Sequence, residues 1–570
     1  MQNIQKFFKK SFPYIVIVCI GLFLINPVFI EGFYPMHDDT QVVRVHQMAQ
    51  ALRDGQFPVR WVSDLGYGYG YPIFNFYAPL AYYIGALFVL LGYDVLLSTK
   101  IMIALPLFIA GIGMYLLAKE FWGKSGGIIS AALAMCATYV AVNIFVRGAI
   151  SEYYAYSFIP FVFYSIYTFY KTQTYRYVIL LSLSFFAVIV SHNLTTLMLI
   201  PFFLISLAVL IGIFIRQKKN TCILFLSFAV FTAILLSAFY WLPALLEMKY
   251  TNVSSQIGGK ADFRDHFVCF PQLWESQWGY GGSTPGCIDG LSFRIGKLHI
   301  LLSVLAIPLL FVLKNKKQKL ALGTGFFFVF VSVFFLLPHS TFIWNVTQVF
   351  AYIQYPWRFL SIASLSISFI AGSVILYSSY LPLKLRQVVV LRVVLVLSML
   401  LFSYLLYSDL FKPQTIQNVR SEDLTSFEHI RYKVSKISDE YMPKGFTKPM
   451  YEEDIPRQRI EIVNGDGIIR TLFEQTQNSE YEIQHSQEIT VRANIAFFPA
   501  ISLYLNNKKI PFIPTSEGLL FTIQPTPDNT SIVKIVFEQT IVEKLGNALS
   551  IIGIVGLLAG IIYARKTKQL

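Results

Sequence analysis

The sequence predicts a polytopic α-helical membrane protein that carries one β-rich domain outside the membrane. Of its 570 residues, 55% are hydrophobic and only 14% are charged, whereas soluble domains carry roughly 25% charged residues. Long apolar runs recur through residues 1–408, and the composition turns polar and charged over residues 409–544. Together with a mean hydropathy of +0.56, these observations exclude an ordinary soluble enzyme.

Twelve of the apolar runs are long enough to be expected to cross the bilayer, because a spanning helix needs about 20 apolar residues. A further run, 79–92, has only 14 residues and is predicted to be an interfacial or re-entrant helix. The expected spans are 12–30, 96–118, 126–146, 154–170, 177–192, 194–215, 221–241, 298–313, 321–337, 358–380, 387–408 and 545–564.

The distribution of charge predicts the orientation, because cytoplasmic loops of membrane proteins are enriched in Lys and Arg. With twelve spans and both termini in the cytoplasm, the Lys-rich loops all face inward, and Glu120 is the one cytoplasmic residue among 32 Asp and Glu. The formal net charge of +14 is therefore sorted by membrane side and does not indicate nucleic-acid binding.

The same topology divides the chain into three parts. Residues 1–408 form a transmembrane domain with outer loops 31–95 and 242–297, residues 409–544 form an extracytoplasmic domain, and residues 545–570 form the last span and a cytoplasmic tail. Alternating apolar and polar residues at 459–463, 488–492 and 531–538 predict strands, and Asn506-Asn507 predicts a turn between two more. A β-sandwich is the expected fold of residues 409–544.

Two of the five cysteines, Cys269 and Cys287, fall in the second outer loop. Because outer-face cysteines meet an oxidising environment, a disulfide between them is one interpretation, and two free thiols is the other. The sequence alone does not decide between the two.

Ionisable residues gather at the outer ends of the spans, which favours a cleft at the membrane surface over a transport path. The first outer loop places Asp38 and Asp39 just before a predicted amphipathic helix over residues 41–54, expected to lie on the membrane with its apolar face down. Helix capping explains one Asp at this place. Two adjacent acids repel each other, and this favours a functional role for at least one of them.

The next segment alternates three glycines with Tyr67, Tyr69 and Tyr71, and Tyr77 follows. Glycine lets the backbone approach a ligand closely, and flat tyrosine rings suit sugar rings. An aromatic belt at the membrane interface is the alternative explanation for some of the tyrosines, but it does not explain the alternating glycines.

Two more segments bring charge to the outer rim. Arg147 and Glu152 follow the third span and either pair with each other or place Glu152 opposite Asp38 and Asp39, where Asp39 and Glu152 could hold a divalent cation. Arg358 opens the tenth span from outside, next to Trp357. Its guanidinium group suits phosphate, with snorkelling as the alternative explanation.

On these residues the chain resembles the GT-C glycosyltransferase superfamily and, within it, the YfhO-like and "6-pyruvoyl-tetrahydropterin synthase-related" membrane proteins. One departure is residues 498–501, Phe-Pro-Ala-Ile, where relatives tend to have Pro-Gly-Trp. The soluble pterin chemistry needs a three-His zinc site, and the eight His show no such spacing. The matching stretches are 37–39, 66–80, 147–152, 354–360 and 440–443.

The resemblance implies a multi-pass plasma-membrane enzyme that transfers a hexosyl or pentosyl group, with inversion, from a polyprenyl-phosphate donor to an extracytoplasmic glycan, lipid or protein. It implies Asp38 or Asp39 as the base, Glu152 as a second carboxylate or metal ligand, and Mg²⁺ or Mn²⁺ as the optional cofactor. The alternative is a non-catalytic protein that binds or assembles envelope polymers or transports lipid-linked glycans. The expected substrate contacts are His37, Tyr67, Tyr69, Tyr71, Asn75, Tyr77, Arg147, Trp357 and Arg358.

Overall fold

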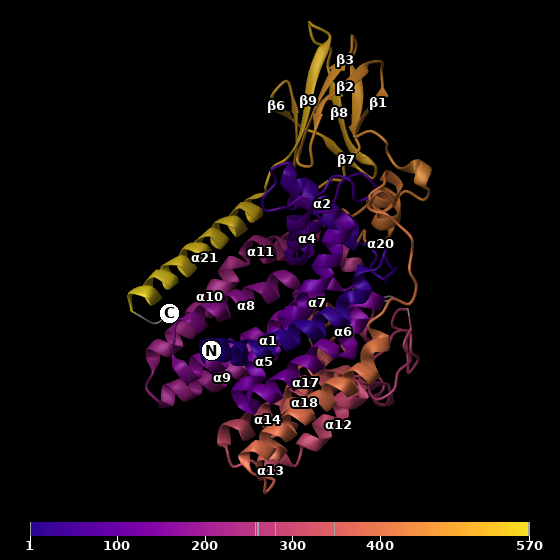
Figure 1. The fold of residues 1–570 in the computed structure, drawn as a ribbon. Coiled ribbons are helices and arrows are strands. Elements are labelled where there is room, and N and C mark those ends of the chain that lie inside the picture. Colours follow the sequence, from indigo (N-terminus) through magenta and orange to yellow (C-terminus); the bar gives the residue numbers. More distant parts are fainter. Residues whose placement is uncertain (1, 257, 259–260, 280, 347, 568–570) are drawn as a thin grey trace.

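The computed structural model describes residues 2–256, 258, 261–279, 281–346 and 348–567. Tilted helices make up most of the molecule, and a domain of β-strands stands on one end of them (Figure 1). The last helix, α21 (Ile541–Lys566), leaves this sheet domain and runs back along the other helices toward the C-terminus. The fold therefore consists of a helical part, a sheet domain and a last helix that returns along the helical part.

The helical part precedes the sheet domain in sequence and is interrupted by two long connections, between α2 and α3 and between α11 and α12. Its first half contains α1 (Gln2–Ile25), α2 (Gln41–Arg53), α3 (Ile73–Phe76), α4 (Leu80–Leu90), α5 (Val95–Cys136), α6 (Thr138–Val142), α7 (Ile150–Thr172), α8 (Arg176–Ser191), α9 (Asn193–Arg216), α10 (Asn220–Leu236) and α11 (Ala238–Leu246). Its second half contains α12 (Lys297–Ala306), α13 (Leu309–Val312), α14 (Lys316–Leu336), α15 (Thr341–Val346), α16 (Gln348–Ala351), α17 (Leu360–Ala371), α18 (Leu385–Tyr407), α19 (Ser421–Leu424) and α20 (Ser435–Ile437).

Within the described residues, seven helical segments are long and apolar enough to cross a membrane, or eight if the pair α10 and α11, bent by 64°, is one span. One of the seven, Val95–Arg147, covers two expected spans, because α5 is kinked at Gly123. The φ of Gly123 is 73°, a value that glycine adopts without strain. Each expected span coincides with a helix, but some are short, so the count of twelve stays a prediction.

The predicted amphipathic helix exists as α2, but it does not lie exposed on a membrane surface. Val45, Met48 and Ala49 are fully buried and face α4 and α5. On the polar side of the helix, Arg44 and Gln47 are also buried. Arg44 donates a hydrogen bond to Ser438, and Gln47 donates one to Asp64. The expected membrane-surface helix is therefore wrong, and α2 is an internal helix. Its neighbour α4 has 11 residues, too few to cross a bilayer at about 1.5 Å per residue.

The sheet domain consists of two antiparallel sheets that share one apolar core. One sheet has the order β1-β4-β8-β7 and the other β2-β3-β9-β5-β6. The predicted turn is present, because Asn506 and Asn507 both have positive φ between β5 and β6, as a tight hairpin requires. The strands are β1 (Ile460–Asn464), β2 (Ile468–Glu474), β3 (Asn478–Gln484), β4 (Ile489–Ala493), β5 (Ile501–Leu505), β6 (Lys508–Ile510), β7 (Ile513–Thr515), β8 (Gly518–Ile523) and β9 (Thr530–Phe537).

The first outer loop joins the sheet domain to the helices. Trp61 and Phe76 belong to the sheet domain's apolar core, where Phe76 contacts Phe498 and Trp61 contacts Phe537. Phe498, at the place where the sequence departs from its relatives, is thus a packing residue. The sheet domain and the first outer loop therefore share one apolar core.

A buried polar cluster completes this contact, and we call Arg60, Asn75, Glu247 and Glu543 the junction cluster. The Asn75 amide donates to Glu543 at 2.5 Å and to Glu247 at 3.4 Å. Arg60 donates to Asn75 and to Asn547, both at 2.7 Å. All four residues are at most 2% exposed, so this cluster links both outer loops to the first turns of α21.

Candidate active site

A cavity of about 550 Å³ lies where the outer ends of the helices meet the sheet domain's connecting segment. Its walls come from the loop before α2, the segment after α3, the starts of α7 and α9, the second outer loop, the segment before α17, and residues 437–441. Seven of the predicted site residues line it: His37, Asp38, Tyr77, Arg147, Glu152, Trp357 and Arg358. Segments far apart in sequence therefore meet at one place.

Arg147 and Glu152 form the buried floor of the cavity. Arg147 ends a π-helical turn (Asn143–Arg147), and Gly148 then reverses the chain with a φ of 69°. Wider turns of this kind are frequent at functional sites. The Arg147 guanidinium donates to Glu152 at 3.0 Å and lies over the Trp357 ring at 4.4 Å. The predicted pairing of Arg147 with Glu152 is therefore present.

Glu152 has no free carboxylate oxygen facing Asp38 or Asp39. One oxygen accepts from the Tyr139 hydroxyl, and the other accepts from Arg147 and lies 3.9 Å from Arg358 Nε. Glu152 is 1% exposed. Its role in this arrangement is to hold two arginines, and we call Arg147, Glu152 and Arg358 the arginine cluster.

His37 and Asp38 reach the same cavity through backbone pairing with the residues around Arg147. The His37 N–H donates to the Val146 carbonyl at 2.9 Å and the Asp38 N–H to the Arg147 carbonyl at 2.8 Å. The Asp38 carboxylate is hydrogen-bonded to His37 at 2.8 Å, and its side chain is 41% exposed. It does not cap α2, whose first residue lacks any side-chain cap. Asp38 is thus a positioned carboxylate open to the cavity.

The surroundings of Asp38 keep it ionised. Burial would raise the pKa of its carboxyl group, but the hydrogen bond to His37 and the positive charges of His37, Arg147 and Arg44 outweigh burial and hold that pKa below its usual value. Burial raises the pKa of the neighbouring Asp39 to about 6. Asp39 does not line the cavity, so the two predicted bases have different surroundings.

Trp357 and Arg358 bring hydrogen-bond donors that no described residue accepts. Trp357 Nε1 and Arg358 Nε and Nη1 are buried without a hydrogen-bond partner, although the Arg358 guanidinium lies 5.1 Å from the Tyr355 ring centre. Unpaired buried donors cost free energy, so such groups indicate an acceptor that binds there. An anion with several oxygens, such as phosphate, fits two guanidinium groups and one indole N–H.

The cavity also contains residues that the sequence interpretation did not assign to the site, although Glu440 belongs to one of the stretches, 440–443, that carry the family resemblance. Arg44 of α2 lies over the Tyr77 ring at 4.1 Å and donates to the Ser438 hydroxyl at 2.9 Å. Glu440, two residues farther on, also lines the cavity. Others are His192, Asn193, Tyr240 and His266. Arg44 and Ser438 are 394 positions apart in the sequence. The sequence offered no signal that they would be in contact.

Four predicted substrate contacts lie outside the cavity: Tyr67, Tyr69, Tyr71 and Asn75. Tyr67 donates to Asp439 at 3.0 Å, Tyr69 packs against Phe446, and the Tyr71 hydroxyl accepts from the Tyr441 N–H at 3.0 Å. Asn75 belongs to the junction cluster. The expectation that these residues touch substrate is therefore corrected, because each is buried and occupied by protein contacts.

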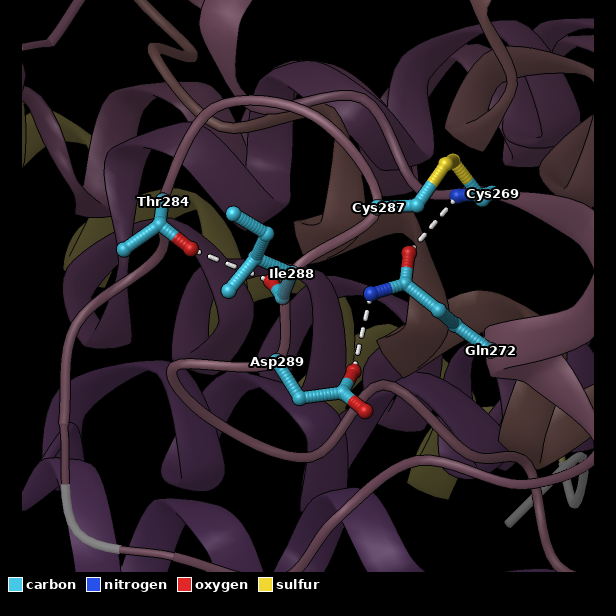
Figure 2. The surroundings of a disulfide bond; sticks show 6 residues. All are labelled: Cys269, Gln272, Thr284, Cys287, Ile288 and Asp289. Carbon is cyan, nitrogen blue, oxygen red and sulfur yellow. Dashed lines mark hydrogen bonds between the residues drawn. A yellow bond between two sulfur atoms is a disulfide. The ribbon is translucent and has the colours of Figure 1, made fainter.

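The second outer loop lines part of the cavity and contains a disulfide. Cys269 and Cys287 are joined, with their Cα atoms 5.5 Å apart, the arrangement that the bridged interpretation expects. Figure 2 shows Gln272 between the Cys269 backbone and Asp289, accepting from the first and donating to the second, both at 2.8 Å. Gly281, Gly282 and Ser283, inside the bridged loop, line the cavity.

The described residues do not fit the predicted divalent-cation site. They contain no group of three or more His, Cys, Asp and Glu placed to hold a metal ion. Asp39 lies outside the cavity, and both oxygens of Glu152 already bind Tyr139 and arginine. A hard cation prefers six or more oxygen ligands, so we assign no step of the chemistry to one.

The fold and the cavity define a membrane protein with a sheet domain, and a polar cavity lies where the helices meet the segment that leads into that domain. The chain belongs to the family described as "6-pyruvoyl-tetrahydropterin synthase related domain; membrane protein", whose model matches residues 74–411. This confirms the resemblance to that family. The pterin chemistry in the family's description has no counterpart in the histidines of the described residues.

One curated protein is similar to this chain in sequence. An uncharacterized protein of Lactococcus lactis subsp. cremoris (strain MG1363) is 27% identical over 284 residues, 48% of this chain and 46% of that protein. This chain thus spans about half the length of the curated relative that it matches.

Two solved structures are similar in fold at low sequence identity. Arabinofuranosyltransferase AftD from Mycobacteria has 12% identity and a TM-score of 0.43, over 72% of this chain and 29% of that one. The Archaeoglobus fulgidus oligosaccharyltransferase has 13% identity and a TM-score of 0.42, over 80% and 61%.

Proposed function

We propose that this protein is a membrane glycosyltransferase that moves a hexosyl or pentosyl group from a polyprenyl-phosphate donor to an acceptor outside the cytoplasm. The observation that carries the proposal is a single cavity that pairs an exposed carboxylate, Asp38, with unpartnered donors on Trp357 and Arg358. Sugar transfer from a phosphate needs both a base and a group that stabilises the leaving phosphate.

The charges of the cavity support a phosphate at the arginine cluster. Within the arginine cluster two guanidinium groups share one carboxylate, Glu152, so the cluster has one positive charge in excess, which the ionised Asp38 partly offsets through Arg147. Apolar residues from membrane helices, including Leu194 and Ala244, line the same cavity. A ligand with a charged phosphate and a lipid chain matches both features.

In the reaction, Asp38 takes the proton of the acceptor hydroxyl, and the hydroxyl oxygen attacks the anomeric carbon of the sugar. The bond between that carbon and the phosphate oxygen breaks, and polyprenyl phosphate leaves with the bonding electrons. Arg358 and the Trp357 N–H bind the added negative charge, and Glu152 keeps Arg147 and Arg358 in place. Attack from the side opposite the phosphate inverts the anomeric configuration.

The orientation belongs to the same proposal, with the cavity and sheet domain outside and both termini in the cytoplasm. Its support is the sorting of Lys and Arg. A cysteine introduced near Lys317 should be shielded from an impermeant thiol reagent in intact cells, and one introduced near Ser283 should react. Labelling at Lys317 from outside would contradict the orientation.

The function is tested by comparing the cell-envelope glycans and glycolipids of cells with and without the protein. We expect one sugar to disappear from one envelope component and to return with the wild-type gene but not with the Asp38→Asn variant. Equal restoration by both genes would favour the non-catalytic alternative. An unchanged glycan profile after deletion would contradict the proposed function.

A further inference from the structure

Residues 437–441, which we call the strap, bring a second polar cluster into the cavity from the side of the sheet domain. All five residues of the strap line the cavity. Its position is fixed by the glycine- and tyrosine-rich loop. Tyr71 accepts from the Tyr441 N–H, and Tyr67 donates to Asp439. The loop that resembled a sugar-binding segment therefore acts as the support of the strap.

The two acidic residues of the strap differ in the groups that bind their carboxylate oxygens. Asp439 is bound on one oxygen by both the Tyr67 hydroxyl at 3.0 Å and Lys448 Nζ at 2.7 Å. Glu440 accepts from the Ser438 hydroxyl, at 3.1 Å on one oxygen and 3.3 Å on the other. One shared hydroxyl leaves most of the acceptor capacity of a carboxylate unused, so Glu440 can accept further hydrogen bonds from a ligand.

Arg44 stands beside Glu440 and is held rigidly. Its guanidinium lies over the Tyr77 ring, donates to Ser438 and to the Tyr82 hydroxyl at 3.2 Å, and keeps a buried Nε without a partner. Burial would lower the pKa of Arg44, but Tyr82, Tyr77 and Glu440 raise it above its usual value. The cluster thus combines one fixed cation, one carboxylate and one aromatic face.

The balance of charge separates this cluster from the arginine cluster. Here one guanidinium, Arg44, interacts electrostatically with one carboxylate, Glu440, so their charges balance, whereas in the arginine cluster two guanidinium groups share one carboxylate. A carboxylate that accepts and a guanidinium that donates match two neighbouring hydroxyls of a neutral molecule. We infer that Arg44, Ser438 and Glu440 bind the vicinal hydroxyls of a neutral acceptor saccharide.

This inference rests on the proposed function and adds the class of acceptor. The phosphate of the donor occupies the arginine cluster in that proposal, and Asp38 is influenced by both Arg147 and Arg44. A saccharide held at Glu440 therefore presents a hydroxyl to the same cavity that contains the base.

The test uses the full-length protein in lipid nanodiscs with two separate probes. The first probe is polyprenyl phosphate without sugar, and the second is a panel of methyl glycosides of neutral hexoses and pentoses. Binding of each is measured by ligand-induced thermal stabilisation. We expect Glu440→Gln to weaken glycoside binding about tenfold, since hydrogen bonds to a charged group are lost, and to leave polyprenyl phosphate binding unchanged. Arg358→Ala should do the reverse.

Two further variants keep the result interpretable. Ser438→Ala removes the hydroxyl between Arg44 and Glu440 with little change of volume and should weaken glycoside binding several-fold. Glu428→Gln, at an exposed residue outside the cavity, is the matched control and should bind both probes as the wild type does. If Glu440→Gln and Glu428→Gln bind the glycosides equally well, the inference is overturned.

Failure of the inference can be told from failure of the proposed function. A wild-type protein that binds polyprenyl phosphate but none of the glycosides overturns the neutral-acceptor site and leaves the donor site standing. A wild-type protein that binds neither probe counts against the proposed function itself. Loss of both probes in Glu440→Gln and in Ser438→Ala, with normal thermal stability, would place the donor's phosphate at this cluster and overturn its assignment to an acceptor.

Discussion

Two buried clusters in this protein combine arginine with glutamate, and they use those residues differently. In the arginine cluster, Arg147 and Arg358 share Glu152 and keep unpartnered donors at a cavity wall. In the junction cluster, Arg60 is bound by the oxygens of two asparagines, and the two glutamates receive the Asn75 amide. The difference is access, because only the first cluster lines the cavity.

This comparison separates groups that bind a ligand from groups that hold domains together. Exposure does not separate them, because no side chain of the arginine cluster is more than 12% exposed and no residue of the junction cluster is more than 2% exposed. Substitutions in the cavity should therefore change binding or turnover, and substitutions at the junction should change stability and its dependence on pH. The predictions below test that separation.

The largest effect is expected for Asp38→Asn. An amide cannot take a proton from the acceptor, and general-base catalysis contributes about 10²–10⁴-fold to rate. Because the Asp38 side chain is 41% exposed, the thermal stability should remain close to that of the wild type. Measurement of sugar transfer in membranes with matched expression checks this. Full activity of the variant would remove Asp38 from the mechanism and leave the cavity without its proposed base.

The next effect compares the two arginines that share Glu152. Arg147→Ala breaks the 3.0 Å pair and leaves a buried carboxylate short of a partner, which typically costs about 3–5 kcal/mol. Arg358 lies farther from Glu152, at 3.9 Å, so Arg358→Ala should cost less stability but weaken polyprenyl phosphate binding more. Thermal unfolding and ligand binding of both variants decide this. The reverse order would assign the phosphate to Arg147.

At the junction, the expected effect is a dependence of stability on pH. Burial, together with the nearby Glu543, raises the pKa of Glu247 from an ordinary 4.5 to about 7, against the opposing effects of Thr540, Arg60 and Lys249. The folded protein therefore holds a proton that the unfolded chain releases above about pH 4.5. Stability should fall as the pH rises from about 4.5 to 7 and then level off.

The size of this effect is about 3 kcal/mol, from 1.36 kcal/mol for each unit of pKa. Glu247→Gln should flatten the pH dependence and raise the melting temperature above pH 7. Thermal unfolding at pH 5 and pH 8 measures it, with Glu428→Gln as the control. A variant whose melting temperature changes with pH as steeply as that of the wild type would contradict the assignment of the proton to Glu247.

The same comparison explains which site residues could be predicted from the sequence. His37, Asp38, Arg147, Glu152, Trp357 and Arg358 were recognisable because ionisable or aromatic residues at the outer ends of spans are exceptional and short connections keep them near one surface. Their cavity could be expected from topology alone. The strands of the sheet domain and the Asn506-Asn507 turn were predictable for an equally local reason, the alternation of apolar residues.

The remaining assignments depended on long-range packing, which local patterns do not encode. Tyr67, Tyr71 and Asn75 have the composition of a sugar-binding loop, but their partners Asp439, Tyr441 and Glu543 lie hundreds of residues away. Glu440 also lines the cavity because of long-range packing. The sequence pattern placed it in the separate domain of residues 409–544. Asp39 and Asp38 were indistinguishable as neighbours in sequence, and only the backbone pairing with Val146 and Arg147 decided which one faces the cavity.

The smallest effect is expected for the disulfide, because it lies at the edge of the cavity and outside both clusters. Replacing Cys269 and Cys287 together by Ser frees a loop of 18 residues, but Asp289 still accepts from Gln272, from Ser276 at 2.6 Å and from the Gln277 N–H at 3.0 Å. These bonds should keep the base of the loop folded. Residues 281–283 then become less ordered. Ligand binding must order them again, and the conformational entropy lost in doing so weakens binding.

We therefore expect the double variant to bind polyprenyl phosphate and methyl glycosides a few-fold more weakly, with slower turnover but an unchanged pH dependence of stability. The last point follows from the comparison, because the loop does not contact the junction cluster through any of these bonds. Ligand-induced thermal stabilisation at pH 5 and pH 8, with the wild type under reducing conditions as a second sample, measures both quantities. If breaking the disulfide instead flattened the pH dependence as Glu247→Gln does, the two regions would be coupled and their separation would be wrong.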